Sequence, residues 1–173
     1  LPTLNDGNVS NLNAFYDKNT RQPGNMSVSF TVTDNLILLD DPRLPIFARP
    51  ANARGSVDYR GATIQMLQNE TTRYLGDSIS LMGTYFLQPV INKILMNASE
   101  VYFLRAEAAL AGISSEDPQA LFTSGIQAAM EQYGVASGDI TAYLSSPSGA
   151  LAGTDEEKLE QIIVQKWLAM YYN

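Results

Sequence analysis

The fold of this chain is decided by residues 97–134, which read NASEVYFLRAEAALAGISSEDPQALFTSGIQAAMEQYG. Asn97, followed three residues later by Glu100, fits a helix N-cap that is reinforced by a reciprocal carboxylate. Gly112 stands where a helix often ends in left-handed geometry. These signals predict a first helix over residues 98–111.

A second helix is predicted over residues 117–133. Asp117 is a good N-cap, and Pro118 suits the first helical position, where its missing N–H costs nothing. Apolar and small residues then recur with helical spacing up to the closing Gly134: Phe122, Gly125, Ile126, Ala129, Met130 and Tyr133. Because about five residues join the two helices, they should pack antiparallel, as a tetratricopeptide-like hairpin over 98–133.

A third, long helix is predicted over residues 155–172, with Thr154 as its N-cap and Glu157 as the matching carboxylate. Glu107 and Lys166 lie in otherwise apolar helices, so we expect a structural ion pair or hydrogen bond rather than catalysis. The aromatic residues at helical spacing are assigned to packing in the core: Tyr102, Phe103, Phe122, Tyr133, Trp167 and Tyr171.

Residues 1–96 have a different character from the helical repeat region over residues 97–173. They hold six of the eight prolines and six of the twelve glycines, which favours loops with short strand and helix elements. Residues 26–32 alternate apolar and hydroxyl side chains, as a half-buried strand does. We expect a short helix before Pro42, an extended segment over 43–50 and an exposed loop over 52–61.

Composition excludes several classes of function. The chain has no histidine and no cysteine, which removes the usual general base, the commonest metal ligand and any Ser-His-Asp triad within it. The net charge of −7, without a basic cluster, argues against a nucleic-acid partner. Asp40 and Asp41 are adjacent and point in different directions, so a turn is favoured over a glycosidase pair. We therefore expect no catalytic residue, no metal and no cofactor.

Three stretches, in this order along the chain, together resemble the SusD/RagB family of outer-membrane glycan-binding lipoproteins. The first is DPRLP at residues 41–45, and the second is ASEVYFLRAEA at residues 98–108. The third runs from GI at 125–126 through YGV at 133–135 to IIVQKWLA at 162–169. The resemblance implies a mainly α fold, a portion of a SusD-like α/α superhelix built of tetratricopeptide-like hairpins and accompanied by a loop-rich region with few short strands.

The same resemblance implies a function at the surface of Bacteroidota-type bacteria. Members of the family bind oligosaccharides or polysaccharides and deliver them to a SusC-type TonB-dependent outer-membrane transporter. They attach to the membrane through a lipid anchor on a cysteine, which is absent from this chain. A tetratricopeptide-like module that binds a protein, without a sugar site, is the alternative reading.

Sugar binding requires aromatic rings that stack on sugar faces and polar groups that bind hydroxyls, usually on loops. The candidates that lie outside the helical stripes are Tyr59, Arg60, Tyr74, Tyr85 and Arg49. Tyr59, on a glycine-flanked loop, is the first of them. Because three helices with apolar stripes need neighbours on both sides, we also expect an uncovered apolar patch, as in a piece of a longer scaffold.

Overall fold

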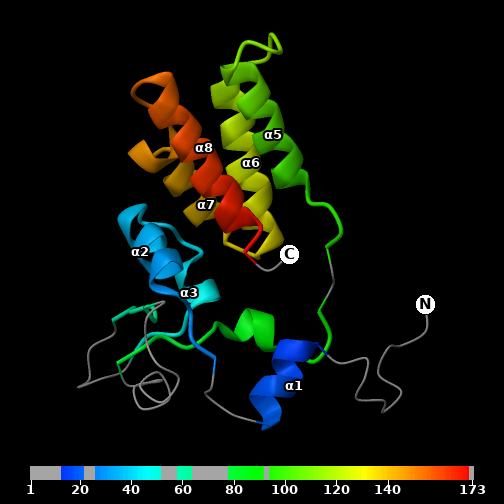
Figure 1. The fold of residues 1–173 in the computed structure, drawn as a ribbon, viewed down its shortest axis with the longest axis vertical. Helices are drawn as coiled ribbons and strands as arrows, with labels where there is room; N and C mark the ends of the chain where they lie inside the picture. Colours follow the sequence, from blue (N-terminus) through cyan, green and yellow to red (C-terminus); the bar gives the residue numbers. More distant parts are fainter. Residues whose placement is uncertain (1–12, 22–25, 52–57, 64–77, 92–93, 172–173) are drawn as a thin grey trace. The chain divides into compact units, whose positions relative to one another are not determined.

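The computed structural model describes residues 13–21, 26–51, 58–63, 78–91 and 94–171. The chain forms two compact units, Leu1–Asn92 and Lys93–Asn173. Helices are the main regular structure in the described residues of both units, and the extended segments meet only in isolated bridges (Figure 1). The prediction of a mainly α fold is therefore confirmed.

The second unit is built on two helices, α5 (Ala98–Leu110) and α6 (Pro118–Gln132), which lie side by side and run in opposite directions (Figure 1). The predicted caps are present. Asn97 Oδ1 accepts a hydrogen bond from the Glu100 backbone N–H at 2.8 Å, and Asp117 Oδ1 accepts one from the Gln119 N–H at 2.9 Å. Local capping chemistry thus sets where both helices begin.

Both helices end as their glycines predict. Gly112 and Gly134 have φ of 71° and 75°, in the left-handed region that favours glycine. The N–H of Ile113 donates to the carbonyl of Ala108 at 2.9 Å, as in a Schellman motif, and the equivalent bond ends α6. These caps satisfy carbonyls that the helix ends would otherwise leave without partners.

Aromatic side chains fill the space between α5 and α6. The rings of Phe103 and Phe122 are buried and meet edge to face, with their centroids 6.2 Å apart. Gly125 lies under the Phe103 ring, where a larger residue would collide with it. The aromatic and small residues of the predicted stripes therefore form the core of this hairpin.

A short helix that the sequence did not predict follows: α7, Ser137–Leu144. Its buried side chains are Ile140 and Tyr143. A short 3-10 turn, η4 (Pro147–Gly149), then leads toward the last helix. With only two apolar residues facing the core, α7 carries too weak a periodic pattern to be recognised.

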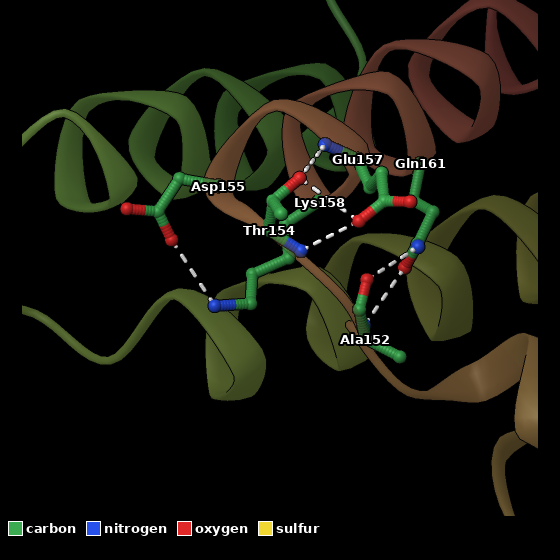
Figure 2. A network of polar contacts seen from close by, with 6 residues as sticks. All are labelled: Ala152, Thr154, Asp155, Glu157, Lys158 and Gln161. Atoms are coloured by element: carbon green, nitrogen blue, oxygen red, sulfur yellow. Dashed lines mark hydrogen bonds and ion pairs between the residues drawn. The ribbon is translucent and has the colours of Figure 1, made fainter.

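Helix α8 (Asp155–Ala169) begins with the predicted capping box, shown in Figure 2. Glu157 accepts hydrogen bonds from the Thr154 backbone N–H at 2.7 Å and from its hydroxyl at 2.8 Å. Gln161 exchanges two hydrogen bonds with the backbone of Ala152, at 3.1 and 2.9 Å. Side chains of the first two turns therefore hold the chain that enters the helix.

Helix α8 packs against α5 and α6. The Tyr133 hydroxyl donates to the Ala169 carbonyl at 2.9 Å. Lys166 and Glu107 form an ion pair between α8 and α5, which confirms the structural role predicted for them. The assignment of Trp167 to the core was wrong, because its side chain is 41% exposed.

The first unit contains α1 (Ala14–Arg21), α2 (Phe30–Leu38), α3 (Leu44–Phe47) and a 3-10 turn, η3 (Thr84–Leu87). The expected strand over 26–32 was wrong beyond residue 29, because the chain becomes helical at Phe30. Val28, Val32 and Leu36 are all buried, at a spacing of four residues. Residues four apart share one face of a helix, and residues two or four apart share one face of a strand. The buried positions are therefore compatible with either structure, and the pattern alone could not exclude the helix.

The segment 43–50 was also predicted wrongly, since α3 occupies part of it. Pro45 lies in the first turn of α3, where proline is tolerated. Before it, Asp41 and Arg43 form a fully buried ion pair, with Nε to Oδ1 at 2.9 Å and Nη2 to Oδ2 at 2.5 Å. Asp41 therefore has a structural role, as its place in a turn predicted.

No helix among the described residues combines the length and the apolar character needed to cross a membrane.

Candidate functional site

Four short extended segments of the first unit are joined by isolated bridges. The bridged pairs are Ser27 with Leu81, Ser29 with Ala62, Ala48 with Met82, and Ala51 with Asp58. Two of the other segments are hydrogen-bonded to residues 79–82. The Val28 N–H donates to the Ser80 carbonyl at 3.1 Å, and the Arg49 N–H donates to the Leu81 carbonyl at 2.8 Å. Backbone hydrogen bonds thus bring together segments that are far apart in the sequence.

Tyr59 and Arg60 belong to one of these segments. The Arg60 N–H donates to Ser80 Oγ at 3.0 Å, and the Ser80 N–H donates to the Arg60 carbonyl at 2.7 Å. The Asp58 carbonyl accepts from the Ala51 N–H at 2.7 Å. The backbone on both sides of Tyr59 is therefore held in place by hydrogen bonds.

Glycine allows the segment to pass close to the start of α2. A β-carbon on Gly61 would lie 2.2 Å from backbone atoms of Phe30, so no larger residue fits there without movement. The Gly61 N–H donates to the hydroxyl of the buried Thr33 at 3.0 Å. This contact ties the segment that carries Tyr59 to the packed part of the unit.

The residues immediately before and after Tyr59 in the sequence are charged. Arg60 and Asp58 form an exposed ion pair, with Nε to Oδ2 at 2.8 Å and Nη2 to Oδ2 at 2.7 Å. Tyr59 is half-buried, and burial raises the pKa of its phenol above the ordinary value of 10.0. The segment thus carries an aromatic ring able to stack on a sugar and, at the two adjacent residues, a guanidinium and a carboxylate able to bind hydroxyls.

Arg49 is bonded to residues 81–82 through both its backbone and its side chain. Its Nε donates to the Met82 carbonyl at 2.9 Å, and its side chain is half-buried. Since Arg60 is bonded to Ser80, the structure attaches Arg49 and Arg60 to neighbouring positions of one segment. Both candidates are therefore bonded to residues 80–82.

Tyr85 lies in η3 and is half-buried. Its ring meets the adjacent Phe86 ring at an angle of 79°, with centroids 5.2 Å apart, and Phe86 in turn packs edge to face on Phe47. This places Tyr85 at the edge of the apolar core of the unit. Tyr74 lies outside the described residues.

Two polar residues of the cluster were not among the sequence candidates: Ser80 and Asp58. Ser80 is fully buried and is joined to Arg60 by hydrogen bonds through both its side chain and its backbone. Asp58 stands next to Tyr59 in the sequence, and that adjacency was the available signal. Nothing in the sequence pointed to Ser80, because the residue that it contacts, Arg60, lies twenty positions away.

Comparison with known proteins gives the family. The family model described as "Starch-binding associating with outer membrane" matches residues 3–173. No curated protein matches the sequence. The fold and the family match agree, and the chain belongs to this SusD-like family.

Solved structures share the fold. A SusD homologue from Bacteroides fragilis matches with a TM-score of 0.79 and 24% identity, over 92% of this chain and 39% of its own. A SusD homologue from Bacteroides vulgatus matches with a TM-score of 0.69 and 26% identity, over 85% and 35%. A chitin-binding protein matches with a TM-score of 0.67 and 24% identity, over 82% and 34%. The chain thus spans little more than a third of the length of these relatives.

Proposed function

We propose that this chain is part of a surface glycan-binding protein and that the segment carrying Tyr59 contributes to its sugar site. The observation that supports this most is the hydrogen-bonded backbone around Tyr59, whose two neighbours in the sequence form the exposed Asp58–Arg60 pair. A segment whose backbone is already held by hydrogen bonds loses little conformational freedom when a sugar binds. The family's description as starch-binding and the chitin-binding relative are consistent with a glycan as the ligand.

The wider role follows from the family. A protein associated with the outer membrane that binds oligosaccharide would pass it to a SusC-type TonB-dependent transporter, and it would act without cleaving the sugar. In this proposal Arg49, Arg60 and the ring of Tyr59 take part in binding, and Tyr85 and Tyr74 are the further aromatic candidates. The localisation at the cell surface belongs to the same proposal.

Glycan binding by the complete protein tests the proposal, first on a glycan array and then by calorimetry with the glycan that binds. Replacing Tyr59 by Ala should weaken binding by about 1 kcal/mol, through loss of stacking, and should leave the fold intact. Tyr59→Phe keeps the ring and should bind nearly as well as the parent protein.

The matched control is Tyr102→Ala, which removes a half-buried tyrosine from α5, in the other unit. Binding that is unchanged in Tyr59→Ala, or reduced equally by Tyr102→Ala, would remove Tyr59 from the site. Glycan cleavage that depends on a carboxylate of this chain would overturn the non-enzymatic role.

A further inference from the structure

Arg49 has no carboxylate partner within the described part of the chain. Its side-chain hydrogen bond runs from Nε to the Met82 carbonyl, at 2.9 Å. Because the side chain is half-buried, part of its charge is removed from water without a counter-charge. Every other described arginine forms an ion pair: Arg21 with Asp17, Arg43 with Asp41, Arg60 with Asp58, and Arg105 with Glu116. The missing partner of Arg49 therefore points to an anion that is bound from outside.

The free edge of the Arg49 guanidinium is open to solvent. Nη1 and Nη2 accept no partner among the described residues, and neither of them is a buried atom. The bond from Nε to the Met82 carbonyl restrains the plane of the group. The two Nη atoms then present one N–H each, side by side, in the geometry that matches the two oxygens of a carboxylate.

The register of the bridged segments places Arg49 on the face that points away from the core. Ala48 lies opposite Met82 in an antiparallel bridge, and both side chains are buried. Successive side chains of an extended segment point to opposite faces, so Arg49 and Leu81 lie on the other face. Ser27 is bridged to Leu81 and shares that face. Arg49, Leu81 and Ser27 are all half-buried, as an outer face requires. One outer face thus carries both the guanidinium and the Ser27 hydroxyl.

The charge of the first unit does not oppose an anionic ligand. Residues 1–92 hold seven of the eleven Lys and Arg residues and eight of the eighteen Asp and Glu residues. Nearly all of the net charge of −7 therefore lies in the second unit. Among the charged candidates of the first unit, Arg60 is already neutralised by Asp58. The charge that remains available to a ligand is that of Arg49.

The uncompensated charge distinguishes an acidic sugar from a neutral one. A sugar hydroxyl accepts a hydrogen bond from the guanidinium but brings no negative charge. A carboxylate supplies two acceptor oxygens and the counter-charge together. We propose that Arg49 binds the carboxylate of an acidic sugar, so that the ligand is a glycan that contains uronic acids or other carboxylated sugars. This inference rests on the proposed function, because it takes the ligand to be a glycan.

The first test uses the complete protein on an array of carboxylated, sulfated and neutral glycans. We expect binding to carboxylated members. The carboxylated glycan that binds best is then compared by calorimetry with its carboxyl-reduced form, in which each carboxylate is replaced by a primary alcohol. The reduced form should bind on the order of tenfold more weakly, because it loses the charge-assisted hydrogen bonds to Arg49.

Variants of Arg49 give the second test. Arg49→Gln should weaken binding of the carboxylated glycan on the order of tenfold and leave binding of the reduced form unchanged. Arg49→Lys keeps the charge but not the planar pair of donors, so it should fall between the parent protein and Arg49→Gln. The control is Lys18→Gln, which removes one positive charge from an exposed position of α1 in the same unit and should bind like the parent protein.

The possible failures of the inference and of the proposed function are distinguishable. Binding to neutral or sulfated glycans alone would overturn the inference and leave the proposed function standing. Equal losses of both glycan forms in Arg49→Gln would show a structural role for Arg49, and an equal loss in Lys18→Gln would show a general effect of charge. Either result would also overturn the inference. If no glycan on the array binds, the proposed function fails, and the inference fails with it.

Discussion

Gly125 of α6 lies directly against the ring of Phe103 of α5, so that a β-carbon on Gly125 would be 2.7 Å from Phe103 Cε1. The same glycine costs its helix stability, because glycine in a helix interior is less favourable than alanine by about 1 kcal/mol. The close approach of α5 and α6 therefore depends on a residue with a low intrinsic helix propensity.

Gly125→Ala should lower the free energy of unfolding by about 1–2 kcal/mol, because the overpacking against Phe103 exceeds the gain in helix propensity. The control is Gly138→Ala in α7, where nothing lies within 4 Å of an added β-carbon. That substitution should stabilise the protein by about 0.5–1 kcal/mol. Urea denaturation of both variants measures the contrast, and a stabilising Gly125→Ala would show that the ring moves aside at little cost.

Asp41→Asn removes the negative charge from the buried ion pair with Arg43. Because breaking such a pair strands a desolvated charge, the free energy of unfolding should fall by about 3–5 kcal/mol. Asp17→Asn is the control, since its partner Arg21 is 68% exposed and surface pairs contribute about 0–1 kcal/mol. Similar losses in the two variants would contradict a special role for the DPRLP segment.

Thr154→Ala removes the hydroxyl of the capping box at the start of α8 (Figure 2). Loss of an N-cap should destabilise the protein by about 1 kcal/mol, as measured by thermal unfolding. Thr154→Ser keeps the hydroxyl and should behave like the parent protein. The prediction fails if alanine and serine at this position unfold at the same temperature.

Burial raises the pKa of Tyr171 to about 12 from its ordinary value of 10.0. The unfolded state therefore loses this proton first as the pH rises, so the stability present below pH 10 should decline between pH 10 and about 12. The decline due to Tyr171 should be at most about 3 kcal/mol. Tyr171→Phe has no phenol to ionise, so its unfolding should depend less on pH over this interval, and an identical pH profile in both proteins would contradict the assignment.

The positions of α5, α6 and α8 could be predicted from residue types and their spacing alone. Their ends depend on contacts within a few residues, such as Asn97 with Glu100, Thr154 with Glu157, and Gly112 in left-handed geometry. Local hydrogen bonds of this kind can be read from residue types and spacing. The motifs carried by the same helices also identified the family.

The tertiary structure decided what depends on contacts between distant segments. Helix α2 starts at Phe30, whose N–H donates to Ala62, and this bond ends the extended run that the alternation predicted. Trp167 follows the same spacing as buried residues of α8, but no described element of its unit covers that face. The position of Tyr59 likewise depends on Arg60 meeting Ser80, twenty residues away. Sequence periodicity tells which side chains share a face, whereas only packing tells which faces are covered and which segments meet.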